Sequence, residues 1–489
     1  MQGAVAAGHP LTVEAGARVL EAGGNAVDAC VAAAFASWVA EAPLTGPGGG
    51  GFMLVHTGRD CRTRVFDFFV AVPGSGRRGE PRPMETIDVV FEGSETQVFR
   101  IGEATVAVPG TALGLEAAHR AHGSLPWRDL VGRAVELARE GVELRPAQAY
   151  LHRILDAILR HRPESRAIFG ADEPLGEGDR LVQRDLADTI ERIGERGAAE
   201  LYTGETGRAV AAHVQRSGGL VTSDDLAAYR VVRRRPVATE YRGQEFRSNP
   251  PPSSGGLLIA FGLERLERSD APAGSAEAMV AIAEAMRAQS ATRDGGFVAA
   301  LYRGGLAKRL LAGTTHISVI DGNGDAASLS CSLGAGSGVV VPGTGVHLNN
   351  MLGEIGLRGS TRTGARMSSM MAPSVLVRNG RARVVVGSAG SLRLYGAIMQ
   401  VVANVVGHGL GVEEAVSAPR VHLDGELLHC EGGADEAELD RLEELGWELV
   451  RWQRRNLYFG GVAAVEVLVD GTLAAAGDPR RGGAGAVVT

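Results

Sequence analysis

The residues best suited to chemistry lie in one stretch, AGTTHISVIDGNGDAASLSCSLGAGSG, at residues 312–338. Gly313 directly precedes Thr314 at the start of a strand-like run. If the bond between them is cut, Thr314 carries a hydroxyl and a free α-amine, whose pKa of roughly 7.7–8 lets it act as base for that hydroxyl. Glycine also tolerates the strained backbone that exposes its carbonyl to attack. A plain β-strand, with threonines chosen for strand propensity, is the alternative, and TTHIS alone does not exclude it.

Other common catalytic motifs are missing from the sequence. No serine lies in a GxSxG elbow, and neither HExxH nor GxxxxGK[ST] occurs. Residues 46–51, GPGGGG, formally satisfy GxGxxG, but a dinucleotide site needs a strand before that loop and a helix after it. Here the strand-like run FMLVHT follows the loop. We therefore interpret the glycines as backbone that packs close to a site.

The elements that must position these residues change in character along the chain. The first segment predicts helices at residues 12–22 and 25–38, the second with Asn25 as N-cap and an acid three residues later. Residues 112–240 and 256–312 are predicted mostly helical, with a strand-like run at 233–243 and a sharp turn at 249–256. Residues 314–350 and 382–391 predict strands. Helices at 396–419 and 435–446 precede a closing hairpin at 462–480. This order favours a layered α+β fold over repeating βαβ units.

The amino-acid composition of the chain limits the classes of partner that we expect. The 489 residues are 45% hydrophobic and 22% charged with a net charge of −7, which is ordinary for a globular protein. No basic stripe with interleaved aromatics occurs, so we expect no nucleic-acid partner. The most apolar stretch, residues 26–42, contains two acids and is too short to predict a membrane span. The first residues lack an export signal. We expect a cytoplasmic protein without membrane contact.

The chain has four cysteines, too few and too scattered for a disulfide framework or a metal pattern. We expect free thiols in a reducing compartment. No metal or other cofactor is expected.

Beyond these features, the chain resembles the γ-glutamyltranspeptidase family over nearly its whole length. The matching stretches, in the family's order, are EAGGNAVDACVAAAF, GPGGGGFML, VPGTALGLE, DLAAYRVV, PPPSSGG, TTHISVID, HLNNML, MSSMMAPS, GSAGS and GDPR. The resemblance implies an N-terminal-nucleophile (Ntn) hydrolase with a four-layer αββα sandwich. It also implies one precursor cut into two interleaved subunits, residues 1–313 and 314–489, that form a heterodimer, with further assembly of that heterodimer left open.

The resemblance assigns roles to individual residues. Thr314 matches the family nucleophile, and Ser332 falls where the family has a second threonine that bonds the catalytic amine or hydroxyl. Gly390 and Ser391 match a glycine pair whose backbone N–H groups form the oxyanion hole, each worth on the order of 3 kcal/mol of transition-state stabilisation. His316 belongs to the motif, and we expect only a supporting role for it.

Substrate recognition departs from the family pattern. Ser368 and Ser369 match two serines that hold the glutamyl α-carboxylate, but Phe69 stands where the family has an arginine for that group. Losing a guanidinium removes a strong charge-assisted contact. The α-amino group is held in the family by an asparagine and an acid, and these positions are Gly334 and Glu354 here. The pattern indicates that the chemistry is retained and the substrate has changed. The alternative is that the enzyme still binds a glutamyl group and that these positions have drifted in sequence under weaker constraint.

Three hypotheses follow for function. The first is acyl transfer or hydrolysis through Thr314 on a specialised amino-acid-derived small molecule. An example from the family is the hydrolysis of a C–C bond beside an oxo acid in alkylproline antibiotic biosynthesis. The second is a conventional γ-glutamyl hydrolase or transpeptidase acting on glutathione-type substrates. The third is an uncleaved, non-catalytic binding scaffold, which the intact Gly-Thr-Thr sequence argues against.

Overall fold

The computed structural model describes residues 3–76, 79–90, 96–294, 313–354, 362–390 and 393–489. Within these residues, two large β-sheets form the centre of the molecule. The first runs in the order β22-β1-β11-β12-β2-β3-β8 and the second in the order β21-β20-β16-β15-β10-β9. The strands of the first sheet are β1 (Gly3–Ala7), β2 (Gly50–Thr57), β3 (Arg62–Phe68), β8 (Val232–Arg234), β11 (Gly313–Asp321), β12 (Ala326–Gly334) and β22 (Ala484–Val488). Those of the second are β9 (Val237–Tyr241), β10 (Gln244–Ser248), β15 (Ser374–Arg378), β16 (Arg381–Ala389), β20 (Gly461–Val467) and β21 (Leu473–Gly477).

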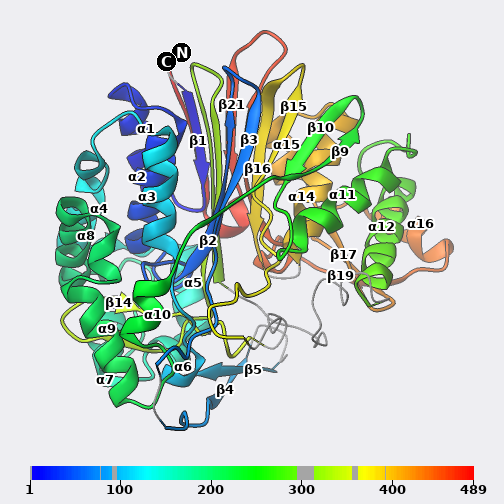
Figure 1. The fold of residues 1–489 in the computed structure, drawn as a ribbon. Helices are drawn as coiled ribbons and strands as arrows, with labels where there is room; N and C mark the ends of the chain where they lie inside the picture. The colour runs from blue at the N-terminus through cyan, green and yellow to red at the C-terminus, as the bar shows by residue number, and fades with distance from the viewer. Residues whose placement is uncertain (1–2, 77–78, 91–95, 295–312, 355–361, 391–392) are drawn as a thin grey trace.

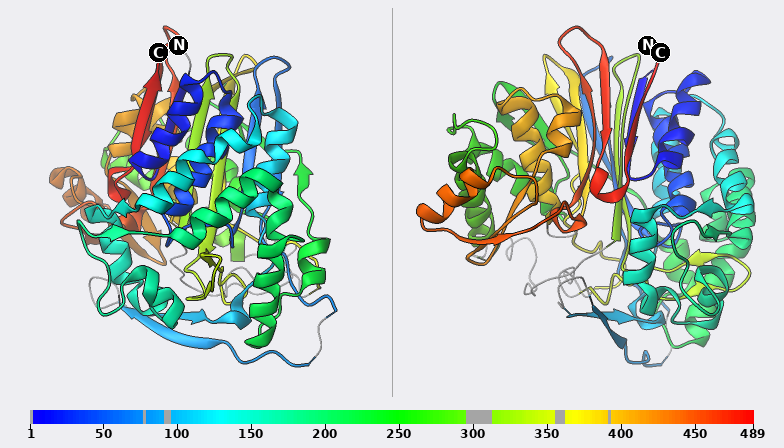
Figure 2. Two further views of the ribbon diagram at one scale, coloured as in Figure 1. Left: turned by 90° about the vertical axis from the view of Figure 1, so that its left-hand side faces the viewer. Right: turned by 180° about the vertical axis from the view of Figure 1, so that it is seen from behind.

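The two sheets pack face to face, and helices cover the outer face of each (Figure 1). Against the first sheet lie α1 (Pro10–Glu21), α2 (Ala26–Ala40) and α3 (Thr111–His122), while α4 (Gly132–Glu140) packs against α2, and α8 (Arg184–Arg196) packs against α4. Against the second sheet lie α11 (Gly255–Leu266), α14 (Leu394–Val402) and α15 (Val412–Ser417), while α12 (Ala276–Asp294) packs against α11, and α16 (Glu436–Glu444) packs against α12. Seen from behind, in the right-hand view of Figure 2, the sheets again lie between the two sets of helices. The result is the predicted αββα sandwich.

Three buried clusters hold the layers together, because each sheet and each helix has an apolar face that must leave water. One cluster joins the first sheet to its helices, a second joins the second sheet to its helices, and a third lies between the sheets. Helix α2 is buried along its whole length, which its run of alanines permits. Its start has the predicted capping box of Asn25 and Asp28.

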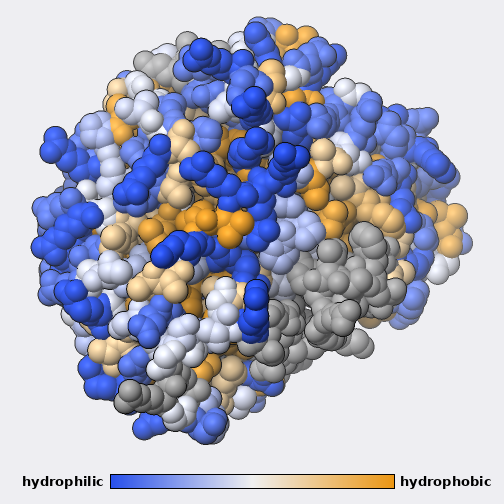
Figure 3. All heavy atoms as spheres, viewed as in Figure 1, coloured by the Kyte–Doolittle hydropathy of each residue, from blue (hydrophilic) through white to orange (hydrophobic). Residues whose placement is uncertain are grey.

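Smaller elements surround this sandwich. The hairpin of β4 (Glu85–Val90) and β5 (Thr96–Ile101) lies below the sheets in the view of Figure 1. Short helices α5 (Pro146–Ile154), α6 (Asp156–Leu159), α7 (Pro163–Phe169), α9 (Glu205–Arg216) and α10 (Ser223–Ala228) lie on the side of the first helical layer. Beside α12 and α16, a small sheet contains β17 (Val421–Asp424), β18 (Leu427–Cys430) and β19 (Glu448–Arg451). The viewed face is mainly hydrophilic, with smaller hydrophobic areas (Figure 3).

The structure adds one element that the sequence did not predict. The predicted helices at residues 12–22 and 25–38 are confirmed as α1 and α2, but strand β1 precedes them and lies between β22 and β11 in the first sheet. All five of its residues are buried, so the run GAVAA shows no alternation of polar and apolar positions that would reveal a strand. The predicted closing hairpin is confirmed as β20 and β21, which pair antiparallel. The four cysteines are free.

Candidate active site

The candidate residues meet at one end of four adjacent strands of the first sheet. Gly313 pairs with Gly334 across β11 and β12, Ser332 pairs with Gly50 across β12 and β2, and Gly51 pairs with Phe68 across β2 and β3. The strand register therefore aligns residues that are far apart in sequence. Since neighbouring strands lie about 4.8 Å apart, the β3 end of this row is about 14 Å from β11.

The glycine loop before β2 packs directly against this row. A Cβ atom at Gly49 would lie 2.3 Å from the carbonyl oxygen of Ser332, and one at Gly51 would lie 2.2 Å from that of Ser330. No larger residue fits these two positions without moving β12. The interpretation of residues 46–51 as close-packed backbone, rather than a dinucleotide loop, is confirmed.

The Gly313–Thr314 bond lies at an irregularity in the pairing of β11 with β12. Between the pairs Gly313–Gly334 and Thr315–Cys331, two residues of β12 face the single residue Thr314. Such bulges re-aim side chains and are frequent beside active sites. Ser332, one of the two bulged residues, donates a hydrogen bond from its Oγ to the carbonyl oxygen of Gly313. The backbone N–H of Gly334 donates to the same Oγ at 2.8 Å. Ser332 thus contacts the carbonyl that self-cleavage would attack.

Two charged residues that sequence reasoning missed hold the other side of β11. Arg481 donates from Nη1 to the carbonyl oxygen of Thr314 at 3.0 Å. Glu41 accepts from Thr315 Oγ1 at 2.5 Å and from Thr12 Oγ1 at 2.9 Å. Burial raises the pKa of Glu41, although both hydroxyls and the charge of Arg481 oppose the shift. The matching stretch GDPR ends at Arg480, one residue before Arg481, and no matching stretch contains Glu41.

His316 is a buried, neutral side chain. Burial lowers its pKa to about 3. Its Nδ1 is 2.8 Å from Ser330 Oγ and its Nε2 is 3.0 Å from Ser318 Oγ. A Cβ atom at Gly387 would lie 2.2 Å from the ring, so β16 of the second sheet presses against it. These contacts fit a role in joining the two sheets.

The end of β16 approaches Thr314 from the second sheet. Thr314, Ala389 and Gly461 line one small cavity together with Arg481. Gly390, the first predicted oxyanion-hole residue, follows Ala389 and has a φ of +129°, which favours glycine. Ser391, the second, lies outside the described residues.

Phe69 lies at the β3 end of the row and is fully buried between the sheets. Its ring stacks on Phe52 with centroids 5.5 Å apart and an interplanar angle of 17°. Its carbonyl oxygen accepts from Tyr229 Oη at 2.7 Å and from Arg366. The guanidinium of Arg366 also pairs with Asp67 at 3.0 Å. Arg366 is therefore committed to supporting the turn after β3, and the ring of Phe69 belongs to the core.

The paired serines stand beside Phe69. An antiparallel bridge joins Ala71 to Arg366, so the register places Ser368 opposite Phe69. The carbonyl oxygen of Ser369 accepts from the N–H of Ser254 at 2.9 Å. The hydroxyl of Ser253 also donates to it, at 3.0 Å. The sharp turn at residues 249–256 thus supports the segment that carries the two serines.

Gly334 and Glu354, the two residues predicted at the amino-group position, lie close to each other beside Asn350. Gly334 has a φ of +72°, a conformation that glycine adopts readily and asparagine more easily than other residues. A Cβ atom here would lie 2.1 Å from Asn350 Oδ1 and 3.1 Å from Glu354 Oε1. Burial raises the pKa of Glu354 to about 7, and among the described residues its Oε1 has no hydrogen-bond partner. The acid is retained, and Asn350 fills the space beside it.

Comparison with known proteins decides the family. The family model for gamma-glutamyltranspeptidase matches residues 12–298 and 299–488. The chain belongs to this family. It is 32% identical to the glutathione hydrolase proenzyme of Escherichia coli K12, over 98% of this chain and 90% of that protein. It is also 32% identical to the acylase ACY 1 proenzyme of Pseudomonas sp. strain V22, over 97% of this chain and 91% of that protein.

Solved structures support the fold. The cephalosporin acylase from Bacillus halodurans matches with a TM-score of 0.81 at 24% identity, over 99% of this chain and 95% of that chain. The predicted Ntn-hydrolase fold is confirmed, and the chain is a hydrolase or transpeptidase of the Ntn type. Among the described residues, no helix combines the length and apolarity that crossing a membrane requires.

Proposed function

We propose that this chain cleaves itself between Gly313 and Thr314, and that Thr314 is the nucleophile of the mature enzyme. The observation that carries the proposal is the Ser332 hydroxyl bonded to the Gly313 carbonyl oxygen, at a bulge centred on Thr314. A donor on that oxygen stabilises the negative charge that develops there when the carbonyl carbon is attacked. The proenzyme names of the two relatives support the same reading.

Self-cleavage follows from this arrangement in two steps. The hydroxyl oxygen of Thr314 attacks the carbonyl carbon of Gly313, the C–N bond breaks, and the departing nitrogen takes a proton to become the α-amine of Thr314. Water then hydrolyses the resulting ester, which leaves a carboxylate on Gly313 and restores the threonine hydroxyl. The fragments 1–313 and 314–489 both contribute strands to the first sheet, so they remain interleaved.

In the mature enzyme, the α-amine of Thr314 takes the proton of its own hydroxyl, because its pKa of roughly 7.7–8 is near the ambient pH. The hydroxyl attacks the substrate carbonyl, the leaving group takes the proton, and an acyl ester forms. Water or an amine acceptor then removes the acyl group. Ser332 positions the nucleophile, and the N–H groups of Gly390 and Ser391 bind the oxyanion.

The substrate is proposed to be an amino-acid-derived acyl compound whose recognition does not depend on an ion-paired α-carboxylate. Phe69 offers no charge, and its ring is locked in the core against Phe52. The guanidinium of Arg366 is occupied by Asp67 and by the Phe69 carbonyl. Glu354 remains to bind an amino group. The same attack also breaks a C–C bond beside an oxo group, if the carbon leaving group is stabilised as an enolate and protonated.

A denaturing gel tests the nucleophile. Purified protein should run as fragments 1–313 and 314–489, with the smaller fragment beginning TTHIS, and Thr314→Ala protein should stay intact. Cleavage of the Thr314→Ala protein after residue 313 would disprove the assignment, as would a single full-length band for the unaltered protein after long incubation.

A matched substrate pair tests recognition. We compare γ-glutamyl-p-nitroanilide with its α-methyl ester, which differs only in the carboxylate charge. An enzyme that pairs the carboxylate with arginine should prefer the free acid by roughly 10- to 100-fold in kcat/KM, the worth of one charge-assisted hydrogen bond. For this protein we expect poor turnover of both with less than a roughly threefold preference. Robust turnover with strong preference for the free acid would establish the conventional γ-glutamyl activity instead.

A further inference from the structure

The side of β11 that faces the helices contains a buried acid next to the scissile bond. Side chains alternate along a strand. His316 faces the second sheet, where it touches Gly387, whereas Thr315 faces the layer of α2. Glu41, which caps the C-terminal end of α2, is only 3% exposed and receives the Thr315 hydroxyl. It therefore contacts the residue after the nucleophile from the face opposite the second sheet.

The position of Glu41 is tightly constrained. Its second oxygen accepts from Thr12 in α1, so the carboxylate joins α1, α2 and β11. Gly8, at the turn between β1 and α1, comes so close that a Cβ atom there would lie 2.5 Å from Glu41 Oε2. Movement of Thr315 away from its present place would leave a buried carboxylate oxygen without its donor, which is costly in a low-dielectric interior.

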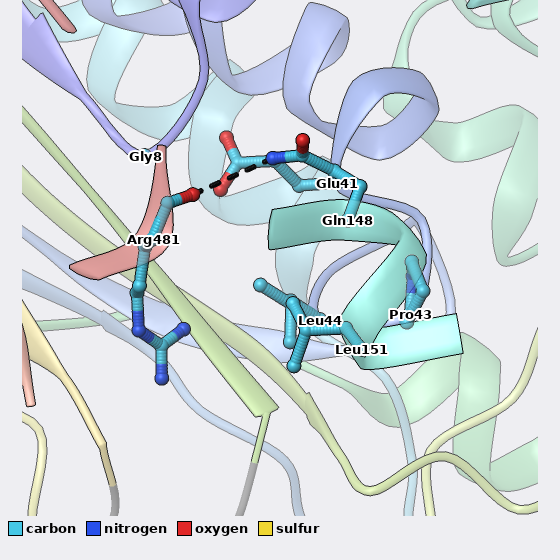
Figure 4. A pocket seen from close by; sticks show the side chains of 7 residues that line it. All are labelled: Gly8, Glu41, Pro43, Leu44, Gln148, Leu151 and Arg481. Carbon is cyan, nitrogen blue, oxygen red and sulfur yellow. Dashed lines mark hydrogen bonds between the residues drawn. The ribbon is translucent and has the colours of Figure 1, made fainter. Parts of the chain in front are cut away.

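Arg481 completes the contact on the same segment. It is 8% exposed and donates to the carbonyl oxygen of Thr314, and its Cδ packs against Gly461, where a Cβ atom would lie 2.2 Å away. Burial lowers the pKa of Arg481, and the charges of Glu41 and Asp478 oppose that shift. Glu41 and Arg481 line two cavities together. One reaches Thr314, and the other extends to Gln148 and Leu151, as Figure 4 shows.

We propose that Glu41 is a positioning residue for cleavage of the Gly313–Thr314 bond, acting through the Thr315 hydroxyl and through the charge of Arg481. Ser332 then fixes residue 313, Arg481 fixes residue 314 and Glu41 fixes residue 315, so three successive residues are held from two sides. The proposal rests on the role of Thr314 proposed above. Its chemical basis is that a nucleophile must be held near its target carbonyl, and that small misplacements cost large factors in rate.

A buried acid can also serve stability alone, and the chain offers a matched example. Glu466 is 2% exposed, burial raises its pKa, and it accepts from Arg383 at 2.7 Å and from the N–H of Val412 at 3.0 Å. It lies on β20, three residues from Ala463, the nearest residue of this strand that lines the cavity at Thr314, and hence about 10 Å along the strand from that cavity. Glu466→Gln is therefore the control for the loss of a buried charge.

The test follows self-cleavage of the full chain during cell-free synthesis, with samples taken over time for denaturing gels. The variants are Glu41→Gln, Thr315→Val, Thr315→Ser, the double variant Glu41→Gln/Thr315→Val, and the control Glu466→Gln. Stability is compared in the Thr314→Ala background, where all chains are uncut. Mature protein is assayed for kcat and KM separately.

We expect Glu41→Gln and Thr315→Val to slow cleavage by roughly 10- to 100-fold. Thr315→Ser should stay within about threefold of the unaltered chain, because it keeps the hydroxyl. Adding Glu41→Gln to Thr315→Val should slow cleavage by less than Glu41→Gln does alone, as expected for residues acting as a unit. In mature protein, kcat should fall with KM unchanged, since neither residue is expected to touch the substrate.

The proposal is overturned if Glu41→Gln cleaves at the unaltered rate, or if Glu466→Gln slows cleavage as much as Glu41→Gln. The proposal is also overturned if the fold reductions in cleavage rate of Glu41→Gln and Thr315→Val multiply in the double variant, because the two residues would then act independently. Cleavage of Thr314→Ala after residue 313 would instead refute the proposed nucleophile, so the two failures are distinguishable.

Discussion

The two ends of the row β11-β12-β2-β3 differ in what their side chains and backbone face. At the β11–β12 end, hydroxyl, guanidinium and carboxylate groups converge on a bulge around Thr314. At the β3 end, Phe69 packs between the sheets and its carbonyl is held by Tyr229 and Arg366. In the proposed function, the first end places atoms for a reaction. The second is built as core, although the family resemblance implies a contact with a substrate carboxylate at the position of Phe69.

If Thr314 is the nucleophile, as proposed, this difference means that one part of the site is retained while another part is structural. Such a change is tolerated because the turn after β3 keeps its support: Asp67 is paired with both Arg366 and Arg234. The ring gains burial that a charged side chain at this position would lack. The comparison predicts that substitutions at the β3 end change stability first, and that substitutions at the β11–β12 end change the rate of maturation first.

Phe69→Ala should produce the largest loss of stability. Removing a buried aromatic ring leaves a cavity and costs about 3–5 kcal/mol of the free energy of unfolding. Urea denaturation in the Thr314→Ala background measures the loss, with Phe69→Leu as the milder control. The otherwise unaltered chain carrying Phe69→Ala should still cleave itself at low temperature. A loss below about 1 kcal/mol would show that the ring does not support the core.

Ser332→Ala should slow self-cleavage by on the order of 100-fold, since it removes the donor on the Gly313 carbonyl oxygen. Densitometry of the full-length band over time provides the rate. Ser332→Thr keeps a hydroxyl and serves as the matched control. Maturation of Ser332→Ala at the unaltered rate would place the oxyanion donor elsewhere.

Glu354→Gln should remove a pH-dependent part of the stability. The pKa of Glu354 is raised from 4.5 to about 7. Between these pH values the unfolded chain has released the proton that the folded chain retains. The free energy of unfolding therefore falls as pH rises through this window, in total by on the order of 3 kcal/mol for this group. Urea denaturation near the two limits, in the Thr314→Ala background, measures the fall, and the Gln variant should show a correspondingly flatter dependence. Equal slopes would contradict the raised pKa.

Tyr229→Phe should have the smallest effect, about 1 kcal/mol of stability, because the Phe69 carbonyl keeps its bond from Arg366. Thermal denaturation of the uncut form suffices to measure it, and the cleavage rate should not change. A change in the cleavage rate of Tyr229→Phe would show that the β3 end of the row affects the reaction at the β11–β12 end, and the distinction between the two ends would then be wrong.

Local signals predicted much of the fold. The capping box at Asn25, the glycine turns after residue 314 and the Asp-Gly turn of the last hairpin each act over a few residues, so sequence alone reveals them. Strand β1 escaped prediction because its neighbours β11 and β22 come from the far end of the chain, and burial on both faces removes any alternation.

The candidate site divides in the same way. Thr314 and Ser332 lie in one contiguous motif, and the strand pairing brings them together as that motif suggests. Glu41 and Arg481 are 440 positions apart in the numbering, and only the assembled sandwich places both beside Thr314. Their isolated sequence contexts contain no trace of this contact. Similarly, the register that sets Ser368 opposite Phe69 depends on long-range pairing.

Arg481 follows Thr314 by 167 positions, and its contact with the Thr314 carbonyl has a consequence for the life history of the chain. If that contact is needed for cleavage, a nascent chain cannot mature until synthesis has passed residue 481 and this segment has left the ribosome. Synthesis, assembly of both sheets and activation must then occur in that order. Peptide-bond scission would act as a quality checkpoint, and a truncated or misassembled polypeptide would remain an inert precursor.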